Sequence, residues 1–252
     1  MEKPSISEPS PLSPTRWPAD AFSWQRSLGV FVALLVAFFV GLRLDGYVAV
    51  QIFHTPLHDF IVQNLTWGIE LGQYVSYLPI LAVLLIALPW AAQRSLYELG
   101  LRGFDRATLV AGGLGAIAMY VVTIGVAQVQ FFITHQKPQE AAITLFTSTH
   151  DKGLIAAFAF LAAVAAPFME EFVFRGFLFN AFLRYMPVWA AALLSGLLFG
   201  ASHGSWSAGL PLAASGVVLA YVYARSGSLT AAMLTHALFN LVNIALISVV
   251  KT

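Results

Sequence analysis

The sequence contains no cysteine and very little charge. With no cysteine among its 252 residues, the chain has no disulfide bonds, thiolate metal ligands or cysteine nucleophiles. Charged residues make up only 10% of the chain, whereas soluble domains carry about a quarter. The net charge of +1 is too small to indicate nucleic acid as a partner.

Apolar residues take the place of the missing charge. They make up 59% of the chain, and the mean hydropathy is +0.78. Such a composition is typical of a multi-pass membrane protein. The apolar runs predict an all-α, polytopic helical bundle with about seven transmembrane helices, at residues 28–44, 67–92, 109–134, 153–183, 188–202, 210–224 and 229–250.

Three regions follow from this pattern. Residues 1–25 are rich in proline and serine and are expected to form a disordered, cytoplasmic tail. Residues 26–150 form an N-terminal transmembrane region, in which we expect the less apolar segment 46–66 to lie at the membrane interface or as a re-entrant loop. Residues 151–252 carry the polar motifs described next.

The basic residues indicate an orientation. Seven spans with the N-terminus in the cytoplasm place most of them inside, as the positive-inside rule requires. The inner set is Lys3, Arg16, Arg26, Arg94, Arg102, Arg106, Arg184 and Arg225, and the outer set is Arg43, Lys137, Lys152 and Lys251.

Two adjacent carboxylates and an arginine interrupt the fourth apolar run. An ionisable residue at membrane depth costs a few kcal/mol, about 3 on insertion scales, and is by default a candidate functional residue. Glu171 and Arg175 are four residues apart and share a helix face, whereas Glu170 is rotated by roughly 100°. We therefore expect Glu171 and Arg175 to form a structural ion pair, and Glu170 to face a cavity with a carboxylate available for chemistry. Pro167, one turn earlier, is expected to kink the helix.

Two more polar groups occur in later apolar runs. His203 follows Phe199 by one helical turn, and His236 and Asn240 share a face at a spacing of four residues. A single membrane histidine commonly just bonds a neighbouring helix. Together with Glu170, these residues are of the types that activate water and bind an oxyanion.

These motifs resemble a known family. The order Glu170-Glu171-x-x-x-Arg175, Phe199-x-x-x-His203 and His236-x-x-x-Asn240 on separate helices resembles the CPBP intramembrane proteases, also called the Abi family. That group includes CAAX prenyl endopeptidases and bacteriocin-processing or immunity proteins. The resemblance covers roughly residues 167–240, so residues 151–252 are expected to form a CPBP-like catalytic core.

The resemblance implies a role for each residue. Glu170 and His203 would hold and activate a water molecule, while His236 and Asn240 would stabilise the oxyanion of an attacked peptide carbonyl. Glu170, His203 and His236 could instead bind zinc, although the sequence lacks the His-Glu-x-x-His helix of zinc proteases. A glutamate mechanism without a cofactor is favoured, with zinc as the alternative.

The implied partners are a membrane-embedded or lipidated peptide substrate, such as a prenylated CAAX peptide, and the lipid bilayer, with no nucleic acid. The implied location is a prokaryotic plasma membrane. The alternative from another class is a non-catalytic membrane protein of the same fold, such as a bacteriocin immunity protein or partner scaffold. A transporter is disfavoured because the intramembrane charge is concentrated at one place rather than repeated in two halves.

Overall fold

The computed structural model describes residues 21–53, 65–135 and 151–251. These residues are almost entirely helical, and none of them forms a strand. The long helices are α1 (Trp24–Phe53), α3 (Leu65–Ala92), α4 (Arg106–Thr134), α9 (Val188–Ser202), α10 (Trp206–Ser226) and α11 (Leu229–Lys251). Between α4 and α9 lies one continuous helical segment, made of α6 (Lys152–Phe160), η2 (Leu161–Ala165), α7 (Ala166–Glu171), η3 (Phe172–Phe179) and α8 (Asn180–Leu183).

The helices confirm the predicted multi-pass membrane fold. Six of them are long and apolar enough to cross a bilayer, counting residues 152–183 as one, and α9 is a shorter apolar helix of 15 residues. The protein is therefore an integral membrane protein with a helical bundle of about seven membrane helices.

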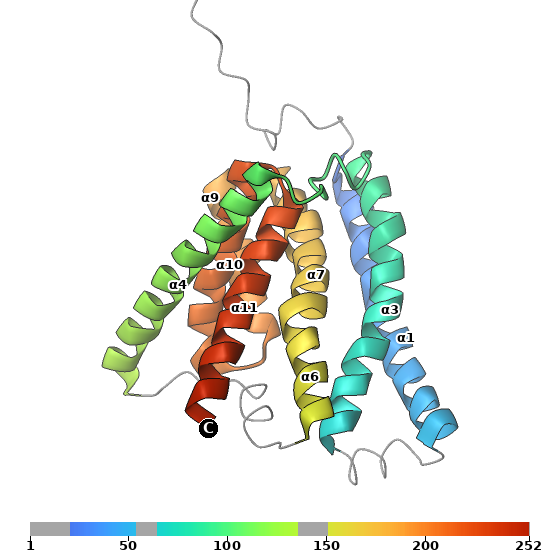
Figure 1. The fold of residues 1–252 in the computed structure, drawn as a ribbon. Coiled ribbons are helices and arrows are strands. Elements are labelled where there is room, and N and C mark those ends of the chain that lie inside the picture. The colour runs from blue at the N-terminus through green and yellow to red at the C-terminus, as the bar shows by residue number, and fades with distance from the viewer. Residues whose placement is uncertain (1–20, 54–64, 136–150, 252) are drawn as a thin grey trace, which may run out of the picture.

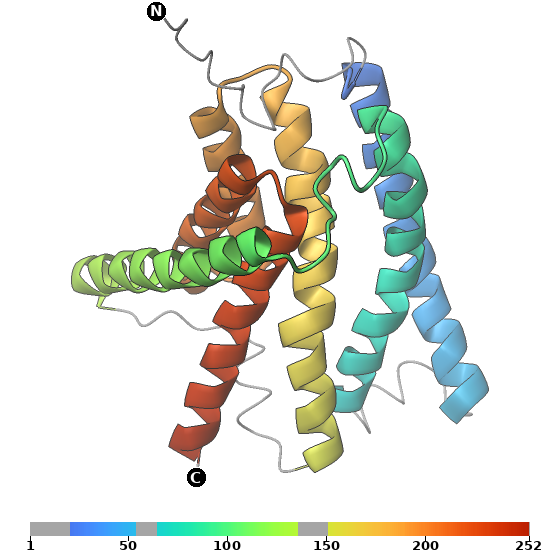
Figure 2. The ribbon, with the colours of Figure 1, turned by 45° about the horizontal axis from the view of Figure 1, so that its top comes forward.

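The segment α6–α8 lies between two groups of helices (Figure 1). On one side α1 packs along α3, and on the other α4 packs on α10 and α11 while α9 packs on α10. Figure 2 shows α6–α8 running along the whole height of the bundle between α11 and α3. Side chains of the central segment can therefore meet residues of α9, α10 and α11 inside the protein.

The central segment contains two stretches of π-helix. In η2 the N–H of Ala166 bonds the carbonyl of Leu161, five residues back, and η3 covers eight residues including Arg175. Short π-helical turns are frequent at functional sites. Pro167 lies two residues after the end of η2, and the helix continues through it to Leu183. Proline has no N–H to donate to the preceding turn, and the wider turn of η2 accommodates this missing hydrogen bond without breaking the helix.

The first helix is longer than the sequence predicted. Residues 46–53, expected in an interfacial or re-entrant segment, continue α1 as regular helix to Phe53. Residues 46–53 therefore do not form a re-entrant loop, because this stretch is mostly apolar and the first proline comes only at Pro56. The interfacial alternative stays a prediction, since the apolar span within α1 ends at Leu44. Residues 54–64 lie outside the described ranges, as do residues 1–20 of the predicted tail.

The connection between α3 and α4 holds the start of α11. Gly100 has a φ of 94°, and its carbonyl accepts bonds from the N–H groups of Leu229 and Thr230 at 2.8 and 3.3 Å. The Thr230 hydroxyl donates to the carbonyl of Arg102 at 2.7 Å. The start of α11 is thus attached to an extramembrane connection. Within the same connection, hydrogen bonds from Ser95 lower the pKa of Glu98.

The orientation of this bundle can be tested with the native sequence as a background. Because the chain has no cysteine, single cysteines replacing Ser95 and Gln139 test the prediction that these two positions lie on opposite sides of the membrane. We expect an impermeant thiol reagent added to intact cells to label Gln139→Cys and to spare Ser95→Cys. The reverse pattern would contradict a cytoplasmic N-terminus.

Candidate active site

A buried ion pair lies at the centre of the candidate site. Nη1 of Arg175 donates to Oε1 of Glu171 at 2.9 Å, and both side chains are 0% exposed. Nη2 of Arg175 donates to the carbonyl of Gly216 in α10 at 2.9 Å. The guanidinium also lies over the ring of Phe199, 4.8 Å from its centroid. Arg175 therefore connects the central segment to both α9 and α10.

Gly216 allows this approach of α10. A Cβ atom built at Gly216 would lie 2.8 Å from the Cα of Gly196, which is closer than side chains pack. Small residues on both helices therefore bring the α9 and α10 backbones together. The Gly216 carbonyl can then reach Arg175 as a hydrogen-bond acceptor.

His236 of α11 lies between the two carboxylates. Its Nδ1 is 3.0 Å from Oε1 of Glu171, and its Nε2 is 3.8 Å from Oε2 of Glu170. Since Glu171 is paired with Arg175, its carboxylate oxygen accepts, and we infer that Nδ1 of His236 carries the proton. Nε2 is then the atom turned toward Glu170.

The two adjacent glutamates have different surroundings. The Glu170 side chain is 24% exposed, whereas Glu171 is fully buried. The exposed fraction leaves room for water at Glu170. In contrast, Oε1 of Glu171 already accepts hydrogen bonds from Arg175 and His236. Helical geometry alone predicted this difference between neighbours.

His203 lies at the end of α9, one residue after its last helical position. Its Nδ1 is 2.9 Å from the carbonyl of Phe199, which can only accept, so Nε2 is the free acceptor of a neutral ring. The rings of His203 and His236 both pack against Phe199, with centroids 4.9 and 5.6 Å away. Since α9 has only 15 residues, its length of about 22 Å at 1.5 Å each is shorter than the hydrocarbon core of a bilayer, about 30 Å. Figure 1 shows the connection from α9 to α10 part-way along the bundle.

Asn240 completes the predicted set. Its side-chain nitrogen donates to the carbonyl of Ala162 in η2 at 2.7 Å. A π-helical turn disturbs the regular backbone ladder, and the Asn240 amide satisfies a carbonyl there. The second amide hydrogen of Asn240 is not used by this bond. The structure thus brings Glu170, Glu171, Arg175 and His236 together, with His203 and Asn240 attached through Phe199 and Ala162.

A zinc site is the alternative that the predicted ligands raise. Within the described residues, no three side chains of His, Cys, Asp or Glu converge so that they could hold a metal ion. Glu170, His203 and His236 therefore do not fit as a ligand set in this arrangement.

The sequence prediction missed a polar network beside the site. The Asn180 amide donates to the carbonyls of Arg175 and Gly176 and to the hydroxyl of Tyr223, each at 3.0 Å. Tyr223 in turn donates to the carbonyl of Leu99 at 2.9 Å. Asn180 is a polar residue in an apolar helix, and that signal could have identified it. The network connects the α3–α4 connection to the segment that carries Arg175.

The fold and the site define the class of the protein. It is an integral membrane bundle with a buried cluster of carboxylate, arginine and histidine side chains. Residues 152–242 of the chain match the family described as Type II CAAX prenyl endopeptidase Rce1-like. This match confirms the resemblance to the CAAX proteases, and the matched region includes every predicted site residue. The description is that of a family of CAAX prenyl endopeptidases, and the match covers residues 152–242 of the 252. No curated protein and no solved structure gives a significant match.

Proposed function

We propose that the protein is an intramembrane endopeptidase that hydrolyses a peptide bond of a membrane-associated or prenylated, CAAX-type substrate. The observation that carries the proposal is the position of Glu170. Its carboxylate is partly exposed and lies 3.8 Å from Nε2 of a histidine whose other nitrogen is held by Glu171. A base beside an oriented imidazole is an arrangement for activating water.

In the proposed reaction, Glu170 removes a proton from a water molecule that His203 holds through Nε2. The water oxygen attacks the carbonyl carbon of the scissile peptide bond and forms a tetrahedral oxyanion. The carbon–nitrogen bond then breaks, and the proton on Glu170 passes to the leaving amine. Each proton taken from water is thus returned to a product.

The oxyanion requires hydrogen-bond donors. We propose that His236 is an imidazolium during this step and donates from Nε2, and that Asn240 donates with its second amide hydrogen. Before the attack, with His236 protonated, two carboxylates, one guanidinium and one imidazolium sum to zero charge; after it, the proton on Glu170 is offset by the negative oxyanion. The cluster then buries no net charge in a low-dielectric setting.

The substrate proposal can be tested with purified protein in liposomes. We expect cleavage of a farnesylated CAAX peptide, detected as a released C-terminal peptide by mass spectrometry. The control is the same peptide without the farnesyl group, which should be cleaved more slowly. Absence of cleavage of any lipidated or transmembrane peptide would favour the non-catalytic scaffold instead.

The metal-free mechanism leads to a further prediction. Active protein is expected to contain well under one equivalent of zinc by elemental analysis, and a chelator should leave its turnover unchanged. Stoichiometric zinc whose removal abolishes activity, with recovery on adding zinc back, would establish the metalloprotease alternative.

A further inference from the structure

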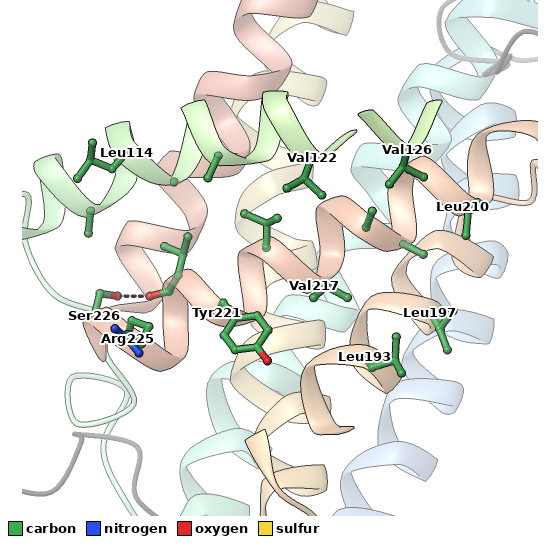
Figure 3. Close-up of a pocket in the computed structure, with 17 residues that line it drawn as sticks. Leu114, Val122, Val126, Leu193, Leu197, Leu210, Val217, Tyr221, Arg225 and Ser226 are labelled. Atoms are coloured by element: carbon green, nitrogen blue, oxygen red, sulfur yellow. Dashed lines mark hydrogen bonds between the residues drawn. The ribbon is translucent and has the colours of Figure 1, made fainter. Parts of the chain in front are cut away.

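An apolar groove lies between α4, α9 and α10 (Figure 3). It has a volume of about 790 Å³, and its walls include Leu114 and Val122 of α4, Leu193 of α9 and Tyr221 of α10. Leu114 and Leu193 are 64% and 48% exposed, so the rim of the groove is open. α4 and α10 are long and apolar enough to span a membrane, and α9 is a shorter apolar helix. The open side therefore faces the hydrocarbon of the bilayer.

The length of the groove suits a lipid chain. On α10 the lining runs from Leu210 to Arg225, which is about 22 Å at 1.5 Å per residue. A hydrocarbon core of about 30 Å gives each leaflet about 15 Å. The groove can therefore hold one acyl chain along its length.

One end of the groove is polar and positive. Arg225, in the last turn of α10, is exposed and is the only charged residue of the lining. Ser226 lies beside it, but its hydroxyl already donates to the carbonyl of Val222 at 2.7 Å (Figure 3). A cation at the membrane-surface end of an apolar groove is complementary to a chain that ends in an anion.

We propose that this groove binds an anionic phospholipid, with an acyl chain along α10 and the phosphate on Arg225. The binding is separate from proteolysis, since none of the residues assigned to the reaction lines the groove. Both features nevertheless involve α10, whose Gly216 carbonyl holds Arg175. A lipid in the groove thus packs against the helix that supports the buried ion pair.

The proposal is tested by native mass spectrometry of the detergent-solubilised protein. Phosphatidylglycerol is expected to bind more tightly than phosphatidylcholine of the same chain length. Arg225→Gln should weaken phosphatidylglycerol binding about fivefold, the contribution of one basic residue near a membrane surface, and leave phosphatidylcholine unchanged. Arg106→Gln is the matched control, because Arg106 is exposed at the start of α4 and does not line the groove; it should bind as the wild type does.

A second pair of variants tests the chain. Ala118 is an exposed lining residue of α4, so Ala118→Phe fills the groove without disturbing the core and should weaken both lipids. Val121→Phe, three residues further on the same helix and outside the lining, should weaken neither. Phosphatidylglycerol with a diazirine in its acyl chain should label peptides from α4 and α10.

Four results would overturn the proposal. Three of them are equal binding of the two lipids by the wild type, an equal loss in Arg106→Gln and Arg225→Gln, and labelling confined to other helices. Displacement of phosphatidylglycerol by a farnesylated peptide would also overturn it, since the occupant would then be a substrate chain.

Discussion

Glu170→Gln is expected to lower kcat by about 10² or more while the melting temperature in detergent stays within a few degrees of the wild type. The amide keeps the shape of the side chain but cannot accept a proton from water. Because Glu170 is partly exposed and makes no ion pair with Arg175, removing its charge leaves the buried cluster intact. The measurement is turnover of a farnesylated peptide together with thermal unfolding of the same sample.

Glu98→Gln is the matched control for this variant. Glu98 is a carboxylate of the α3–α4 connection that pairs with Arg94 at 3.0 Å, away from the cluster. Loss of this exposed pair should leave kcat unchanged. A Glu170→Gln enzyme with wild-type turnover would show that another group activates the water.

Most of the fold could be predicted because its determinants are local. An apolar stretch of about 20 residues must be helical in lipid to satisfy its own backbone, so each long run predicted a helix. The end of α1 could not be predicted, because most of the polar residues of the stretch 46–66 follow Phe53 and make the stretch as a whole less apolar. The π-helical turns also carry no periodic signal, since they depend on partners such as Asn180 and Asn240.

Spacing in the sequence could predict some contacts between the candidate residues and not others. Four-residue spacing placed Glu171 beside Arg175, and the structure places Nη1 and Oε1 2.9 Å apart. No spacing within one helix could predict that Glu171 also holds His236 of α11, because that contact depends on how two helices pack. Spacing also could not predict the hydrogen bond from Arg175 to the Gly216 carbonyl, which depends on the packing of α10. The catalytic roles of Glu170, His203, His236 and Asn240 stay predictions.

Glu171→Gln is expected to lower the stability of the protein, and to lower its activity as a consequence of that loss. It leaves Arg175 without its counter-charge at a fully buried position, and breaking a buried pair typically costs about 3 to 5 kcal/mol. Arg175→Gln should behave similarly because it strands the Glu171 carboxylate. Folded yield and melting temperature in detergent measure both effects.

The double variant Glu171→Gln, Arg175→Gln separates stability from chemistry. Neither charge is then stranded, so the melting temperature should recover in part and exceed that of both single variants. Turnover should stay low, since His236 has lost the carboxylate acceptor that fixes its Nδ1 at 3.0 Å. If the double variant instead regained wild-type turnover, the orienting role of Glu171 would be wrong. If Glu171→Gln proved stable but inactive while Glu170→Gln unfolded, the two glutamates would have exchanged roles, and Glu171 would be the base.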